Sequence, residues 1–275
     1  MHDAFGNRAT SSVCGRRGTH AGRASFPSCA RRRACGGAGL RRGFVDADLG
    51  PRLNDRWVRV FLSLVIFSLL GSLFTRLSGL NPGPIAPVTS VLTLACGVVA
   101  TFRAYVGEGA WVRLLFAFVL GAASELIGLA TGFPFGRYAY TTEWWPTVAL
   151  PMGRFPLMLP FAWLLMAGAS LFVAVRLDRV MWRAVILGGL VAAVVDLAME
   201  PVMAGPLGYW RWLEPGPLPG GAPVANFFGW WATAALAGAV LGFGVPADRL
   251  KSREPAWVLG GFVVLVLGLG AISGS

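Results

Sequence analysis

Residues 111–140 read WVRLLFAFVLGAASELIGLATGFPFGRYAY. Up to Thr131 this stretch is almost entirely apolar, and its length is close to the roughly 20 residues that an α-helix needs to cross a bilayer. Glu125 lies about two turns before the apolar run ends, and a loop rich in glycine, proline and aromatic residues follows. A carboxyl group inside a membrane helix is costly, so it marks a candidate functional site. The stretch therefore predicts a membrane protein with a site near one end of its helices.

The composition supports this prediction for the whole chain. Hydrophobic residues make up 55% of the 275 residues and charged residues 13%, against about 25% charged in an ordinary soluble domain. Of the 24 basic residues, 11 lie at or before Arg56, so the net charge of +11 belongs mostly to the N-terminal part. We therefore expect the membrane part to bind lipid and no nucleic acid.

Residues 1–56 differ from the rest of the chain. They are rich in arginine and glycine and show no apolar periodicity, so we expect a disordered tail or a spurious extension from an upstream start. A transit peptide and a segment that contacts anionic lipid are the alternatives. Residues 57–275 form the predicted transmembrane domain.

The residue types that are missing exclude several classes of enzyme. His2 and His20 both lie in the tail, which excludes histidine-ligated di-iron, haem and zinc chemistry in the membrane domain. Cys96 is alone in an apolar run, and three cysteines lie in the tail with no metal or redox spacing: Cys14, Cys29 and Cys35. There is also no aspartate-rich diphosphate motif, P-loop or nucleophile elbow. The sequence therefore predicts no metal and no cofactor.

Seven apolar segments predict an all-α bundle of about seven transmembrane helices. They lie at approximately 57–74, 84–105, 111–131, 155–175, 182–203, 227–245 and 256–272. If they alternate across the membrane, 20 of the 24 basic residues fall on one face. When the tail is left out, that face still has 9 basic residues and the other face has 4. The positive-inside rule then predicts a multi-pass protein of the plasma membrane with a cytoplasmic N terminus. Three loops meet on the opposite face, which predicts one site there. They are the loop after Leu80, residues 132–151 and residues 205–226.

Two further acids, Asp196 and Glu200, lie one helical turn apart on the same face of the fifth segment. They repel if both are ionised, so one of them is expected to keep a proton, as a general acid requires. The alternative is that the acids pair with arginines and only hold loops on the bundle: Arg137, Arg154 or Arg211. A tyrosine follows both Glu125 and Asp196 after 13 residues, which hints at an internal repeat of helix and loop.

Aromatic residues gather in the loops near these acids and at the start of the sixth segment. They include Phe133, Phe135, Tyr138, Tyr140, Trp144, Trp145, Tyr209, Trp210, Trp212, Phe227, Phe228, Trp230 and Trp231. An aromatic belt at the membrane interface explains such a set without any function. The other interpretation is a wall for a long apolar ligand, with rings that stabilise a carbocation through their faces. Asn226 is either a helix cap or an amide beside this wall.

A series of ordered motifs resembles the carotenoid biosynthesis membrane proteins of the carotenoid 1',2'-hydratase and bisanhydrobacterioruberin hydratase type. The motifs cover residues 57 to the C terminus, and together they are specific. They are SELIG (124–128), GFPFGRY (132–138), YT (140–141), PFAW (160–163), DLAMEP (196–201) and PVANFFGW (223–230).

This resemblance implies an enzyme that adds water to the C1',2' double bond of an acyclic carotenoid such as lycopene, γ-carotene or a bacterioruberin precursor. For this reaction our hypothesis has Asp196 or Glu125 as the acid and Glu200 as the group that positions water. Tyr138, Trp230 and Trp231 then line the cation, and Arg137 tunes the nearby acids. The expected substrate-binding residues are Phe133, Phe135, Arg137, Tyr138, Tyr140, Trp163, Asn226, Trp230 and Trp231. A downstream carotenoid glycosyltransferase is an expected partner. The alternative is a membrane protein without catalytic activity, either a small-molecule transporter or a carotenoid-binding assembly factor.

Overall fold

A computed structural model describes residues 55–103, 105, 109–250 and 252–274. Seven helices in this part of the chain are long and apolar enough to cross a membrane, which confirms the predicted helical bundle. They are α1 (Arg56–Ser78), α2 (Ile85–Phe102), α3 (Ala110–Thr131), α4 (Leu159–Leu177), α5 (Met181–Met203), α6 (Val224–Gly242) and α7 (Glu254–Ser273). An α-helix pairs its own backbone N–H and C=O groups, so it is a conformation that apolar segments can keep in lipid.

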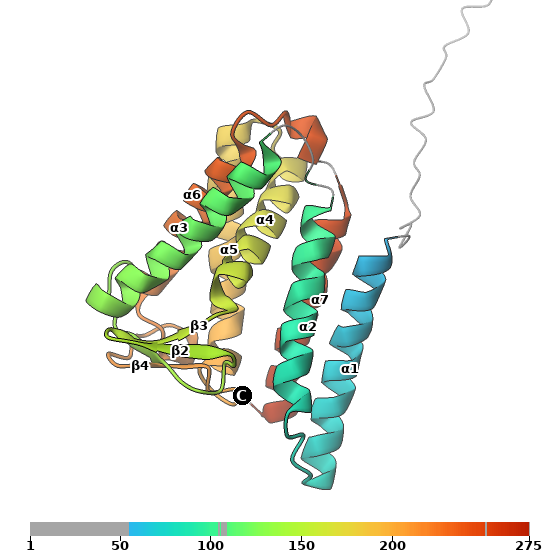
Figure 1. The fold of residues 1–275 in the computed structure, drawn as a ribbon, viewed down its shortest axis with the longest axis vertical. Helices are drawn as coiled ribbons and strands as arrows, with labels where there is room; N and C mark the ends of the chain where they lie inside the picture. The colour runs from blue at the N-terminus through green and yellow to red at the C-terminus, as the bar shows by residue number, and fades with distance from the viewer. Residues whose placement is uncertain (1–54, 104, 106–108, 251, 275) are drawn as a thin grey trace, which may run out of the picture. The chain divides into compact units, whose positions relative to one another are not determined.

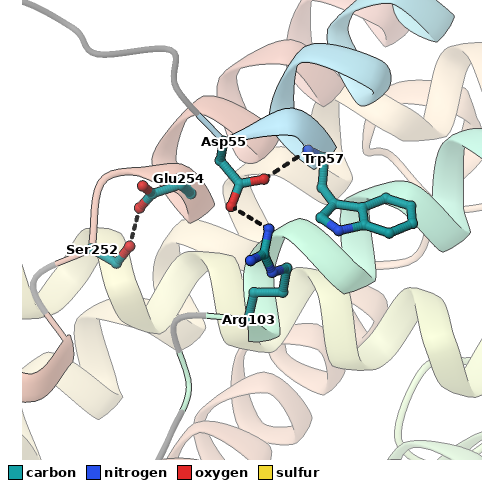
Figure 2. Close-up of polar contacts among 5 residues, drawn as sticks. All are labelled: Asp55, Trp57, Arg103, Ser252 and Glu254. Atoms are coloured by element: carbon teal, nitrogen blue, oxygen red, sulfur yellow. Dashed lines mark hydrogen bonds and ion pairs between the residues drawn. The ribbon is translucent and has the colours of Figure 1, made fainter.

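The predicted tail lies outside the described residues except for Asp55 and Arg56, as do the two histidines and Cys14, Cys29 and Cys35. Asp55 caps α1, because its carboxylate accepts a hydrogen bond of 2.7 Å from the backbone N–H of Trp57. The same carboxylate forms an ion pair with Arg103, at 3.0 Å, just after α2 ends (Figure 2). The described fold thus begins at an anchored helix end.

The helices form two groups that share α4. Helices α1, α2 and α7 pack on one another, whereas α6 packs against α3 and α5 (Figure 1). Helix α4 contacts members of both groups and is the most buried of the seven helices. Helix α4 therefore joins the two groups, and α5 also contacts α7.

Four short strands, which the sequence had not predicted, lie in the loops at one end of the bundle (Figure 1). Strand β1 (Tyr138–Tyr140) pairs with β4 (Trp210–Trp212), and β2 (Thr147–Leu150) pairs with β3 (Gly153–Pro156), both antiparallel. Two short 3₁₀ turns, Pro219–Gly221 and Ala247–Leu250, complete the loops. Because β3 uses residues up to Pro156, α4 begins at Leu159, four residues later than predicted.

Candidate functional site

A cavity of about 1240 Å³ lies between the two helix groups and reaches the loops that carry the strands. This volume exceeds the roughly 300–1,000 Å³ of a site for a drug-sized ligand. One part of its wall is aromatic and acidic and includes Glu125 and Glu200, while α1, α2 and α7 contribute a mainly apolar part. The predicted meeting of three loops is confirmed, because Asn81, Trp144 and Tyr209 all line this cavity.

Glu125 is buried and accepts three hydrogen bonds, each from an aromatic side chain. The hydroxyl groups of Tyr138 and Tyr140 donate to Oε2 at 2.6 and 2.9 Å, and the indole N–H of Trp163 donates to Oε1 at 2.8 Å. All three groups act as donors, which is the arrangement that an ionised carboxylate needs. Glu125 is thus held in one orientation at the cavity wall.

Two glycines on the same face of α3 make room for these donors. A Cβ atom on Gly121 would lie 2.6 Å from Cβ of Trp163, and one on Gly128 would lie 2.6 Å from the hydroxyl of Tyr138. These glycines precede Glu125 by four residues and follow it by three, so they share its helical face. Gly121 and Gly128 of α3 therefore leave the space in which Trp163 and Tyr138 reach Glu125.

Asp196 and Glu200 share a single amide group. The Asn226 side chain donates from Nδ2 to Oδ2 of Asp196 at 2.7 Å and to Oε1 of Glu200 at 2.9 Å. Oε2 of Glu200 also accepts the indole N–H groups of Trp210 and Trp212, at 3.1 and 3.0 Å. Asp196 is fully buried, and its Oδ1 has no hydrogen-bond partner among the described residues. Glu200 faces the cavity, whereas Asp196 lies behind Asn226.

The pairing of β1 with β4 gathers the donors of both acids on one surface. Tyr138 lies opposite Trp212, and Tyr140 lies opposite Trp210. Side chains two residues apart on a strand point to the same face, so all four rings lie on one side of the ribbon. The ring centroids of the two cross-strand pairs are 5.6 and 6.3 Å apart. We call this pair of strands the aromatic ribbon.

The two tyrosines of the aromatic ribbon stay protonated at neutral pH. Burial and the negative charge of Glu125 raise the pKa of Tyr138 and of Tyr140 well above the ordinary tyrosine value. Both hydroxyl groups are therefore available as hydrogen-bond donors to Glu125.

The family follows from comparison with known proteins. A family model described as "Carotenoid biosynthesis protein" matches residues 85–273, which span all of the acids and their donors. The chain belongs to this family. The bisanhydrobacterioruberin hydratase of Haloarcula japonica is 28% identical over 234 residues, which cover 80% of this chain and 78% of that protein. No solved structure matches the chain.

In this carotenoid biosynthesis protein, most of the residues predicted for the site lie together. The cavity wall contains Glu125, Glu200, Phe135, Tyr138, Tyr140, Trp163, Asn226 and Trp230. Asn226 lies in the first turn of α6, but its amide is committed to the two α5 acids. Trp163 and Trp230 stack with their ring centroids 4.3 Å apart, so an aromatic face borders the acids.

Besides Asp196, three of the predicted site residues do not line the cavity: Phe133, Arg137 and Trp231. Arg137 precedes Tyr138 on β1 and so points to the opposite face of the ribbon, where it forms an exposed ion pair of 3.6 Å with Glu214. Phe133 is 73% exposed in the turn after α3. Trp231 follows Trp230 by one residue, about 100° round the helix, and its indole N–H donates to the carbonyl of Ile186. Arg137 therefore does not contact the acids that it was expected to tune.

The alternative that the acids pair with arginines does not match their contacts. Their donors are tyrosine, tryptophan and asparagine side chains, and the ion pairs of the described residues lie elsewhere.

The sequence identifies Trp210 and Trp212 as aromatic residues but not as donors to an acid. Their alternate spacing, repeated in Tyr138 and Tyr140, was the signal for a strand. Within the described ranges, no group of three or more His, Cys, Asp or Glu side chains could hold a metal ion.

Proposed function

We propose that this chain is a carotenoid hydratase that adds water to the C1',2' double bond of an acyclic end group and forms a tertiary 1'-hydroxyl. The observation that carries the proposal is the position of two carboxyl groups from different helices, Glu125 and Glu200, in one large and mainly apolar cavity. The name of the Haloarcula japonica relative, a hydratase, supports the same reaction class. Such a site offers an acid, a base and room for a long apolar substrate.

Glu200 is the proton donor in this proposal. It shares the Asn226 amide with Asp196, and two carboxylates this close repel when both are ionised, so the pair holds one proton. Glu200 is the member of the pair that faces the cavity, so it delivers this proton to C2' and leaves a tertiary cation at C1'. Its three N–H donors, from Trp210, Trp212 and Asn226, stabilise the carboxylate that remains. The sequence-based hypothesis had Asp196 or Glu125 as the acid and Glu200 as the group that positions water. Because Asp196 does not line the cavity, we propose instead that Glu200 is the acid and that Asp196 has a supporting role behind Asn226.

Glu125 is the base. Its three donors favour the ionised form, and this carboxylate accepts a proton from the water whose oxygen bonds to C1'. The product gains one hydrogen at C2' and one hydroxyl at C1', which together equal one water. A proton then returns through water from Glu125 to Glu200, and the site is ready again.

The rings around the acids stabilise the cation. The stacked faces of Trp163 and Trp230 and the rings of the aromatic ribbon border the same part of the cavity. A cation over an aromatic face gains about 0.5–2 kcal/mol, with the larger value where water is excluded. Carboxyl groups and water supply every atom that the reaction needs, so we propose that it requires no cofactor.

The setting in the cell is part of the proposal. The distribution of arginine supports a plasma-membrane protein with a cytoplasmic N terminus, so the acids lie toward the outer face. The tertiary hydroxyl is a suitable acceptor for a sugar, so a carotenoid glycosyltransferase is the proposed downstream partner.

The test is product analysis in a host that makes an acyclic carotenoid. The wild-type chain should produce a carotenoid heavier by one water, with oxygen from isotopically labelled water and not from O₂. Glu125→Gln and Glu200→Gln should each reduce the yield by about 100-fold or more, since general acid–base groups contribute about 10²–10⁴-fold. Oxygen from O₂ would contradict the proposal, as would full activity in both variants and in Asp196→Asn.

A further inference from the structure

The cavity extends from the acids into an apolar arm between α1, α2 and α7. On α1 its lining runs from Phe61 to Thr75, which corresponds to about 21 Å along the helix. The side chains of Leu94 on α2 and Leu265 and Leu269 on α7 complete the wall. We use the term apolar arm for this part of the cavity.

Four hydroxyl groups of the apolar arm form hydrogen bonds within their own helices. Thr75, Thr89, Ser90 and Thr93 each donate to a carbonyl of the preceding turn of their own helix. The arm therefore suits a hydrocarbon chain, since most of its lining is apolar, and Ser68 and Ser72 are the other hydroxyl-bearing residues of α1 in its wall.

Phe61 is the first residue of α1 that lines the apolar arm. Its side chain is fully buried, and its ring lies 3.2 Å from the position of a Cβ on Gly97 of α2 and 2.8 Å from one on Gly261 of α7. The two glycines leave the space that the ring fills. The packed ring of Phe61 thus lines the same cavity as the acids.

Gly71 leaves the middle of the arm open. It lines the cavity ten residues after Phe61, about 15 Å along α1, and a Cβ placed on it would meet no atom within 4 Å. A larger side chain here would project into open space and not into a packed helix. Gly260 on α7 has the same open surroundings but does not line the cavity.

We infer that the polyene chain of the acyclic substrate lies in the apolar arm while its end group reaches Glu125 and Glu200, and that Gly71 determines how much chain the arm admits. This inference rests on the proposed function for the identity of the substrate. A membrane lipid could also supply a hydrocarbon chain, but only the carotenoid has an end group that the acids would protonate.

The experiment compares Gly71→Ala, Gly71→Leu and Gly71→Phe with the same three changes at Gly260, all in the full chain. Each protein is purified in mild detergent, incubated with an acyclic carotenoid and repurified. The carotenoid retained per protein is measured by absorbance, the initial rate of hydration by chromatography, and the fold by thermal unfolding. We expect retention and rate to fall with side-chain volume at Gly71, by at least tenfold for Gly71→Phe, and to stay within twofold at Gly260.

Equal behaviour of the two series would overturn the inference, since it would mean that lipid or nothing fills the arm. A loss at Gly71 that merely follows a lower unfolding temperature would overturn it too. If wild-type protein retains carotenoid but does not hydrate it, the proposed function fails, and retention alone decides the inference. Wild-type protein that retains no carotenoid refutes the assignment of the arm.

Discussion

Replacing Tyr138 with phenylalanine tests whether the hydroxyl groups around Glu125 serve its chemistry. The change removes one oxygen, which donates to Oε2 at 2.6 Å, and leaves the ring in place. A hydrogen bond to a charged group contributes about 1.5–3 kcal/mol, which corresponds to roughly 10- to 150-fold in rate. Tyr140 still donates to the same oxygen at 2.9 Å, so we expect the lower half of this range, about 10- to 40-fold.

The matched control is Tyr209→Phe. Tyr209 lines the same cavity, but its hydroxyl lies 3.5 Å from Ser90 Oγ and is not among the donors to Glu125 or Glu200. The assay is the initial rate of hydration in membranes that contain equal amounts of each protein. A rate for Tyr138→Phe equal to that of Tyr209→Phe would refute the role assigned to the Glu125 shell.

Three more predictions follow from the site. Gly128→Ala places a methyl group 2.6 Å from the Tyr138 hydroxyl, so it should lower the free energy of unfolding by about 1–3 kcal/mol and reduce the hydration rate. The control Gly260→Ala should change neither quantity, and an unchanged unfolding temperature for Gly128→Ala would contradict the prediction. Asn226→Leu removes the donor that two buried carboxyl groups share and should lower stability by about 2–6 kcal/mol in thermal unfolding; a shift below 1 °C would show that the amide is dispensable. Burial and the nearby carboxylate raise the pKa of Tyr138 and Tyr140, so above about pH 10 these tyrosines ionise in the unfolded chain and not in the folded one. The unfolding temperature should therefore fall as the pH rises above about 10, and it should fall less steeply when both residues are phenylalanine.

The sequence predicted the seven helices and the acids because both signals are local. Long apolar runs specify membrane helices, and an acid inside one is conspicuous. Helix boundaries were less accurate where a loop residue decides them. Pro223 lacks an N–H and precedes α6, which therefore begins at Val224 and not at Phe227.

The details of the site depend on pairings that no local pattern shows. The equal spacing of 13 residues suggested that Tyr209 contacts Asp196 as Tyr138 contacts Glu125. Tyr209 instead lies near Ser90. The donors that follow α5 are Trp210 and Trp212, and they bind Glu200. The apolar arm could not be predicted either, since α1 and α7 are apolar on every side and hydropathy does not say which face borders a cavity.

The order of the donors along the chain bears on how these helices enter the membrane during synthesis. Glu125 is followed within 15 residues by Tyr138 and Tyr140, and Glu200 within 12 residues by Trp210 and Trp212. An acid near a helix end is inserted before distant helices exist, and its desolvation is costly until a partner arrives. Here each acid carries its first partners in the segment that leaves the ribosome directly after it. Pairing of β1 with β4 then joins two helix-and-strand segments in which Glu125 and Glu200 already have hydrogen-bond donors, whereas Asp196 receives its donor only when Asn226 arrives on α6.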